Sequence, residues 1–314
     1  MPGGTKIVLG IGDDAAAWRP SRSHVSVITT DALIEDAHFT RSHFTDAQIG
    51  HRALASNLSD IAAMGGRPVL ATIALGVPAG MRREQLLDVY AGMNALAKRT
   101  NTALVGGDIV RSPQLFLSIT VVGEVRSTSL KRRSTARAGD VLAVTGPLGG
   151  SRAGFDAQRD PRALSDELRE HALAKHCTPE PRLAEGRWLA ASHSVHAMMD
   201  LSDGLATDTP RLAYASNLGA LLEHVPIAAS AQAMAQARRM DPVAYTLAAG
   251  EDFELLAAIA PRAFAHLAKQ FEKRFGRPLH GIGHLREGSE MSVQYGGQCS
   301  PLLPAGWDHM ETNT

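Results

Sequence analysis

The sequence predicts two α+β domains, and three features of the chain lead to this prediction. Short apolar runs typical of strands alternate with longer segments of helical periodicity. Long apolar strands also come in neighbouring pairs, such as 102–110 and 115–125, which disfavours a purely doubly wound sheet. Residues 126–139 hold five basic residues and no acidic one, a composition typical of a loop between domains. We therefore expect one domain at 1–135 and a second at 136–314.

Each domain has its own series of expected elements. The first should contain strands at 6–12, 24–33, 68–77, 102–110 and 115–125, with helices at 46–65 and 82–100. Thr45 fits an N-cap for the first helix, and the glycines and proline at 65–68 end it. The second domain should begin with a strand and a glycine-rich turn at 140–150. It should continue with helices near 163–176, 181–192, 205–217 and 261–275, and strands near 195–203, 220–226 and 279–285.

The overall composition limits the classes of partner. The 314 residues have a formal net charge of zero, so no global field would hold the protein on nucleic acid or on an anionic membrane. The two cysteines, Cys177 and Cys299, are far apart and form no CxxC motif, which fits a reducing compartment. The N-terminus lacks a signal-peptide pattern and no stretch of eighteen apolar residues follows, so we expect a cytoplasmic location.

The turn GIGDDAA at 10–16 fits two kinds of phosphate site. Gly10, Gly12 and Ala15 match a dinucleotide fingerprint, but Pro20 leaves no room for the helix that this fingerprint needs. Asp13 and Asp14 would also repel a pyrophosphate at a helix N-terminus. A Mg²⁺ ion between carboxylate and phosphate removes this conflict, since Mg²⁺ prefers oxygen ligands shared by protein and substrate. The turn therefore favours a metal-assisted phosphate site.

Further acidic residues follow apolar elements along the chain, as this interpretation requires. They are Asp31 after 24–30, Asp60 on the first expected helix, Asp108 after Gly106-Gly107, Asp200 and Asp203 in DLSDG, and Glu251, Asp252 and Glu254 in GEDFE. Each alone is more typical of a turn or a helix cap. Together they indicate a site for several cations. The chain has no Gly-Lys pair for a P-loop and none of the protein-kinase motifs.

Eight motifs in order resemble the thiamine-monophosphate kinase family, within the aminoimidazole ribonucleotide synthetase-like superfamily. They are LGIGDDAA, TTDALIEDAHF, NLSDIAAMGGRP, LVGGD, TGPLGGSRAG, DLSDGLATD, GEDFEL and GWDHM, spread over nearly the whole chain. The resemblance implies a two-domain fold whose N-terminal mixed sheets pair into a barrel across a homodimer. It also implies phosphorylation of thiamine monophosphate by ATP with several Mg²⁺ ions.

The resemblance further implies roles for individual residues. Metal ligands would be Asp14, Thr29, Thr30, Asp31, Asp60, Asp108, Asp200 and Asp203. Nucleotide contacts would come from Gly107, Asp108, Arg133 and Ser202, and thiamine phosphate contacts from His38, Glu251 and Trp307. No catalytic general base is expected.

Two further functions stay open from the sequence. One is a sibling ATP-dependent enzyme that activates another small phosphorylated or carbonyl substrate, and the other is a non-catalytic nucleotide sensor. The second is suggested by a departure from the family pattern, because residues 109–112 read IVRS where the family usually has hydroxyl side chains after GGD. Phe253 also replaces the usual tyrosine in GEDYE, and the helix that usually precedes the first strand has no counterpart.

Overall fold

The computed structural model describes residues 6–9 and 17–305. It divides into two compact units, Met1–Leu130 with Cys177–Ala191, and Lys131–His176 with Ser192–Thr314. Each unit is an α+β structure with a mixed sheet, as the sequence predicts.

The first unit is built on a four-stranded sheet in the order β3-β6-β4-β5. Its strands are β3 (His24–Ile34), β4 (Arg67–Val77), β5 (Ala103–Arg111) and β6 (Phe116–Arg126). Strand β6 is antiparallel to both neighbours, whereas β4 and β5 are parallel and joined through a helix. The sequence suggested that the consecutive strands β5 and β6 form a neighbouring pair, and this is wrong, because β4 lies between them.

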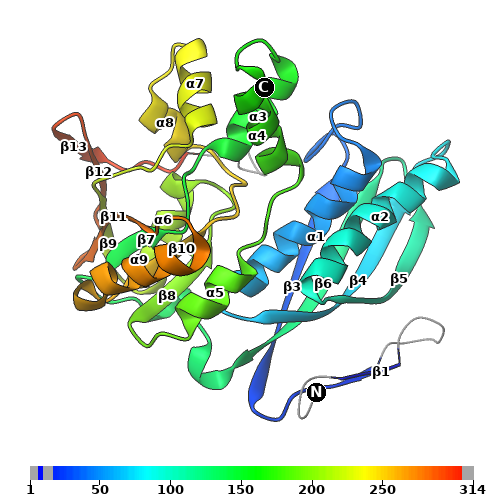
Figure 1. Cartoon of the computed structure of the whole chain (residues 1–314), viewed down its shortest axis with the longest axis horizontal. Coiled ribbons are helices and arrows are strands. Elements are labelled where there is room, and N and C mark those ends of the chain that lie inside the picture. Colours follow the sequence, from blue (N-terminus) through cyan, green and yellow to red (C-terminus); the bar gives the residue numbers. More distant parts are fainter. Residues whose placement is uncertain (1–5, 10–16, 306–314) are drawn as a thin grey trace. The chain divides into compact units, whose positions relative to one another are not determined.

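Helices α1 (Asp46–Ala63) and α2 (Arg83–Thr100) cover one face of this sheet (Figure 1). Thr45 is the N-cap of α1, as predicted, and forms a capping box with Gln48. The two helices and the inward-facing residues of the strands bury one apolar core, which includes Leu54, Leu75 and Leu117. The short helix α5 (Leu183–Ala190) packs against α1. The core fixes α1 against β3, and these two elements hold predicted site residues.

The opposite face of the sheet is more open. Alternate residues of β3 point to it, and Ile28 among them is 72% exposed. A two-stranded ribbon of β1 (Lys6–Leu9) and β2 (Ala17–Arg19) covers one end of this face, where Ile7 packs against Val69 and Val122. The four-stranded sheet has two edges, β3 and β5, so the described part of this unit is not a closed barrel.

The second unit contains a seven-stranded sheet in the order β13-β12-β9-β11-β7-β10-β8. Its strands are β7 (Val141–Val144), β8 (Val195–Asp200), β9 (Gly219–Leu222), β10 (Leu255–Ile259), β11 (His280–Arg286), β12 (Met291–Tyr295) and β13 (Gln298–Pro301). All neighbours are antiparallel except β9 and β12. The central strands β7, β10 and β11 contribute buried residues such as Val144, Leu256 and Ile282 to the apolar core of this unit.

Six helices of the described chain accompany this sheet. They are α3 (Gly150–Arg159), α4 (Asp166–Cys177), α6 (Leu205–Ala215), α7 (Ala229–Ala237), α8 (Pro242–Leu247) and α9 (Pro261–Phe275). The sequence predicted α4, α6 and α9, but not α3, α7 or α8. Helix α6 begins directly after the DLSDG motif at the end of β8, so it places that motif at a strand end and a helix start.

Candidate functional site

In the first unit, residues of β3 and α1 meet on the helix-covered face of the sheet. The Thr29 hydroxyl donates a hydrogen bond of 2.5 Å to the Asp60 carboxylate, and the Asp31 amide donates one of 3.1 Å to Asn57 Oδ1. Asn57 and Asp60 are three residues apart on α1 and both contact β3, so they share one face of the helix. Asp31 and Asp60 are both partly buried. These contacts place two carboxylates and one hydroxyl of the predicted ligand set side by side.

Thr30 and Asp108 lie on the other face of the same sheet. Thr30 pairs with Thr120, donates its hydroxyl proton to Ile119 O at 3.1 Å, and so points away from Asp31. Gly107 pairs with Ile73, whose side chain is in the core, so the next residue, Asp108, points to the open face. Asp108 also lies on β5, three strand spacings or about 14 Å from β3. Within one copy, Asp108 is thus separated from the Thr29–Asp60 group.

Gly107 has a structural role of its own. A Cβ atom at this position would lie 1.9 Å from the carbonyl oxygen of Ile73 on the neighbouring strand. Only glycine therefore allows β5 to pair closely with β4 here. The glycine of the GGD motif is explained by the sheet itself, apart from any contact with a nucleotide.

Two other predicted residues belong to the first part of the chain. His38 lies in the loop after β3, and its Nδ1 accepts a hydrogen bond of 3.1 Å from the Ile34 amide. This bond fixes the ring next to the end of the strand that holds Asp31. Asp14 lies outside the described residues.

In the second unit, the ends of β8 and β10 bring the DLSDG and GEDFE motifs together. Asp200 of β8 pairs with Leu255 of β10, and the segments next to this pair, residues 201–203 and 250–254, stay in contact. The Glu251 amide donates a hydrogen bond of 2.7 Å to Ser202 O, and the Phe253 amide donates one of 3.0 Å to Leu201 O. One group therefore contains Glu251 together with Asp200, Ser202 and Asp203 of the DLSDG motif, although the two motifs are distant in the sequence.

The backbone at Glu251 adopts a conformation that is rare for residues with a side chain. Its φ is 64°, and that of Phe253 is 49°. Left-handed conformations of this kind concentrate at functional sites, where the surrounding structure must hold them. The side chain of Glu251 is 41% exposed, and its Oε2 lies 3.9 Å from Nδ1 of His176. The same nitrogen is 3.1 Å from the Ser151 hydroxyl.

Two residues that the sequence did not single out support the DLSDG turn. The fully buried carboxylate of Asp208 accepts hydrogen bonds of 3.1 Å and 3.0 Å from the amides of Ser202 and Asp203. Arg211 forms ion pairs with both Asp203 and Asp208. Burial raises the pKa of Asp208 to about 6, although the hydrogen bond from Asp203 N and the Arg211 charge oppose the shift. The spacing of Asp208 and Arg211, three residues apart on a helix face, was the available signal.

The other two acids of GEDFE are structural in this unit. Asp252 accepts hydrogen bonds from the amides of Gly149 (2.6 Å) and Ser151 (3.1 Å), so it caps the N-terminus of α3. Glu254 is fully buried and is paired with Lys175 and Arg277. The Asp252 contacts hold the GEDFE segment against α3, and the Glu254 ion pairs tie the same segment to Lys175 of α4 and to Arg277.

We expect the Asp252 cap to make stability depend on pH. Burial raises the pKa of this carboxyl from 3.8 to about 6, despite opposing hydrogen bonds from Gly149 and Ser151. Between about pH 4 and about pH 6 the folded protein therefore keeps a proton that the unfolded chain has lost, so stability falls as pH rises through this window. Urea unfolding should show that wild type loses on the order of 2 to 3 kcal/mol relative to Asp252→Asn between about pH 4 and about pH 7. A difference that is constant with pH would contradict this assignment.

Arg133 is exposed and lies in a short 3-10 turn next to the far end of α6. Its carbonyl oxygen accepts a hydrogen bond of 2.7 Å from Ser216, which follows the last residue of that helix. Eleven helical residues, about 16 Å, separate this position from the DLSDG turn at the start of α6. Arg133 is therefore in the same unit as Ser202 but not beside it. Trp307 lies outside the described residues.

The donor atoms at both groups are of one chemical kind. All the predicted ligands offer carboxylate or hydroxyl oxygens, which suit Mg²⁺ better than softer metals. Among residues 6–9 and 17–305, no cluster of three or more His, Cys, Asp or Glu side chains is arranged to hold a metal ion. The predicted ligands are divided between the two units, and one of them, Asp14, lies outside the described residues.

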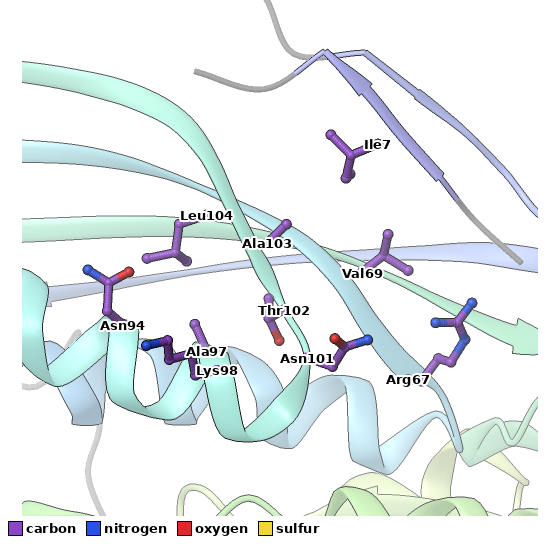
Figure 2. Close-up of a pocket in the computed structure, with 10 residues that line it drawn as sticks. All are labelled: Ile7, Arg67, Val69, Asn94, Ala97, Lys98, Asn101, Thr102, Ala103 and Leu104. Atoms are coloured by element: carbon purple, nitrogen blue, oxygen red, sulfur yellow. The ribbon is translucent and has the colours of Figure 1, made fainter. Parts of the chain in front are cut away.

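A cavity of about 420 Å³ lies in the first unit, where β4 and β5 begin (Figure 2). Its walls are Ile7, Arg67, Val69, Asn94, Ala97, Lys98, Asn101, Thr102, Ala103 and Leu104. Arg67 is also paired with the buried Glu124. The predicted site residues that the structure describes do not line this cavity, so it is separate from both groups.

Among the described residues, no helix is both long and apolar enough to cross a membrane.

Comparison with protein families matches both parts of the chain. Residues 12–125 match the family AIR synthase related protein, N-terminal domain, and residues 137–296 match its C-terminal domain. The chain is also 34% identical to the thiamine-monophosphate kinase of Synechococcus elongatus, over 96% of this chain and 92% of that relative. It is 33% identical to the enzyme of the same name from Bacillus subtilis, over 92% and 89%.

Solved structures show the same fold. The thiamine-monophosphate kinase of Stenotrophomonas maltophilia superposes with a TM-score of 0.81 at 32% identity, over 91% of this chain and 90% of that one. A structure described as AaThiL complexed with AMPPCP and TMP has a TM-score of 0.81 at 27% identity, over 93% and 89%. The two-domain α+β architecture predicted from the sequence is therefore confirmed at the level of the fold.

Proposed function

The chain belongs to the thiamine-monophosphate kinase family, and we propose that it transfers the γ-phosphoryl group of ATP to thiamine monophosphate, giving ADP and thiamine diphosphate. The strongest support is the 34% identity to a kinase of this name over nine tenths of both chains. A relative of the same fold has been solved with AMPPCP and TMP. The geometry supports the proposal because it brings oxygen-bearing side chains together around Asp31 and Asp60 in one unit and around Asp200 and Asp203 in the other.

The chemistry of the acceptor explains why a general base is not required. A phosphate monoester has its second pKa near 6, so the attacking oxygen is already largely ionised at neutral pH. The main barrier is repulsion between two polyanions, about 4 kcal/mol for each pair of unit charges 4 Å apart at an effective dielectric of 20. Direct in-line transfer then depends on positioning and on charge neutralisation. We therefore assign no residue as a base.

Several Mg²⁺ ions would supply this neutralisation by binding oxygens of both phosphate groups. Their protein ligands would come from Asp14, Thr29, Thr30, Asp31, Asp60, Asp108, Asp200 and Asp203. The oxygen-only donor set fits this ion. In the first unit, the bond from Thr29 fixes the orientation of the Asp60 carboxylate, and Asn57 fixes the backbone at Asp31. In the second, Asp208 fixes the backbone at Asp203.

The remaining roles follow the family pattern. We assign nucleotide contacts to Gly107, Asp108, Arg133 and Ser202, and thiamine phosphate contacts to His38, Glu251 and Trp307. Glu251 is suited to the polar or cationic part of the substrate because its strained backbone and its neighbour His176 hold the carboxylate at a partly exposed position. An aromatic face such as that of Trp307 attracts a cationic thiazolium ring.

We further propose that the protein is a cytoplasmic homodimer in which two copies of the four-stranded sheet pair into a barrel. The open face of the sheet supports this, because it exposes Ile28 by 72% and Val110 by 46%. Asp108 points to that face, so a second copy would approach it there. Sedimentation equilibrium should give twice the chain mass of 33.4 kDa, and a mass of one chain would contradict the dimer.

Product analysis tests the substrate assignment. Purified protein is incubated with ATP, Mg²⁺ and thiamine monophosphate, and ADP and thiamine diphosphate are quantified together. We expect both products in equal amounts, and neither without Mg²⁺. ADP release with an aminoimidazole precursor but not with thiamine monophosphate would identify a sibling enzyme. Binding of ATP without any turnover would identify a nucleotide sensor.

A further inference from the structure

The turn that holds Ser202 and Asp203 is immobilised from several directions. Asp208, fully buried, accepts hydrogen bonds from both amides of the turn. On another side, the Glu251 amide binds Ser202 O, and a Cβ atom at Gly250 would lie 2.7 Å from that same oxygen. Gly204 completes the enclosure, since its missing side chain allows approach to the carbonyl of Leu247. The backbone that presents Asp203 is therefore fixed by neighbouring segments.

Arg211 joins this turn through a single guanidinium nitrogen. Nη1 forms an ion pair with Asp203 Oδ2 and a second one, of 3.0 Å, with Asp208 Oδ1. The two carboxylates differ greatly in exposure. The side chain of Asp203 is 28% exposed, that of Asp208 is fully buried, and that of Arg211 is 46% exposed. One cation thus neutralises a partly exposed carboxylate and a buried carboxylate at once.

The two halves of this bridge are unequal in strength. An ion pair between partly exposed side chains changes the equilibrium constant between its paired and separated states by only about two- to fivefold. Removing the partner of a buried charge lowers the folding equilibrium constant by more than about 100-fold. Breaking the Arg211–Asp203 ion pair therefore costs little free energy, whereas breaking the Arg211–Asp208 ion pair costs much more. Asp208 acts as an anchor that keeps the guanidinium next to the turn.

We propose that Arg211 is the resident counter-ion of Asp203. When a divalent cation binds to Asp203, Arg211 releases this carboxylate and remains held by Asp208 beside the site. Arg211 and Asp208 are thus positioning residues for Asp203. The inference rests on the proposed function, because that function requires a divalent cation at Asp203. It implies that Arg211 competes with the metal, so that removing its charge strengthens metal binding.

Direct measurement of Mn²⁺ binding tests this competition. Free Mn²⁺ is followed by its electron paramagnetic resonance signal while it is titrated into wild type and Arg211→Gln, without nucleotide. We expect the variant to bind Mn²⁺ about two- to fivefold more tightly, because one competing cation has been removed. Arg211→Lys, which keeps the positive charge, should bind as wild type does. Thermal unfolding of each variant verifies that it is folded.

Two controls separate competition from a general change in charge. Arg262→Gln, on the exposed surface of α9 in the same unit, removes the same charge and should leave Mn²⁺ affinity unchanged. In an Asp203→Asn background, Arg211→Gln should give no gain, because the shared carboxylate is absent.

Equal or weaker Mn²⁺ binding by Arg211→Gln, or no Mn²⁺ bound by either protein, would overturn the inference. Thiamine diphosphate formation by wild type is measured in parallel. Tighter Mn²⁺ binding without any product would leave the counter-ion role intact and reject the proposed kinase function.

Discussion

Asp31→Asn and Asp203→Asn are each expected to lower the rate of thiamine diphosphate formation by a factor of about 100 or more. A metal ligand contributes several kcal/mol of charge stabilisation in the transition state, and each 1.4 kcal/mol corresponds to tenfold in rate. Asparagine has the shape of aspartate, so the fold should survive. Steady-state kinetics at saturating ATP and Mg²⁺ measure the loss, and urea unfolding should agree with wild type within about 1 kcal/mol.

Asp88→Asn is a matched control for this pair. Asp88 is exposed on α2, and the substitution makes the same change of charge in the first unit. It should retain wild-type turnover. If Asp31→Asn and Asp203→Asn both turned over at the wild-type rate, neither carboxylate would be a metal ligand in the reaction.

The largest effect on stability is expected from alanine at two glycines where α1 and α2 cross. A Cβ atom at Gly50 would lie 1.9 Å from Val89 O, and one at Gly92 would lie 1.8 Å from Ala47 O. Helix propensity alone favours alanine over glycine by about 1 kcal/mol. The overlap with backbone atoms outweighs this gain, because no rotamer change can relieve it. Gly92→Ala should therefore destabilise the first unit by about 3 kcal/mol or more in urea unfolding.

Ala91→Gly, at the exposed position next to Gly92 on α2, separates the two effects. It reverses the propensity change without touching the helix crossing, and should cost about 1 kcal/mol. If propensity were decisive at both positions, Gly92→Ala would be more stable than wild type. That result would mean that the close crossing of α1 and α2 is wrong.

Local sequence signals were sufficient for most of the first unit. Strand β3 alternates in exposure from Ser26 to Ile34, and α1 begins at a complete capping box, so period and caps agree. Pairing was harder to predict. The few residues between β5 and β6 suggest a hairpin, but the parallel unit β4-α2-β5 occupies one side of β4 and β6 occupies the other.

The unpredicted helices of the second unit depend on distant contacts. Helix α3 begins at Gly150, after the N-cap Gly149, whose φ is 84°, and its capping carboxylate is Asp252, about a hundred residues away in sequence. No local N-cap signal marks such a start. Helix α7 buries small side chains such as Ser230, Ala231 and Ala235, so it shows no stripe of large apolar residues. Helix α8 has only six residues, too few to show a period.

The sequence predicts metal ligands by residue type, and the roles of Asp31, Asp60 and Asp203 stay predictions. The structure places Asp31 within β3 and Asp60 within α1, whereas Asp203 follows the end of β8. The face of the sheet on which a side chain lies, and the side chain that it pairs with, could not be inferred in the same way. The sequence does not show that Asp108 points to the open face, or that Arg211 is bound to Asp203, since both depend on sheet register and helix position.

We propose that carboxylates from distant segments of the chain bind the divalent ions that allow one phosphate group to approach another. A crystal structure with a nonhydrolysable ATP analogue, thiamine monophosphate and Mn²⁺, located by its anomalous scattering, tests it most directly. We predict Mn²⁺ within about 2.3 Å of oxygens from Asp31, Asp60 or Asp203 and from the bound phosphates. Phosphates bound with no Mn²⁺ at any of these carboxylates would contradict the account.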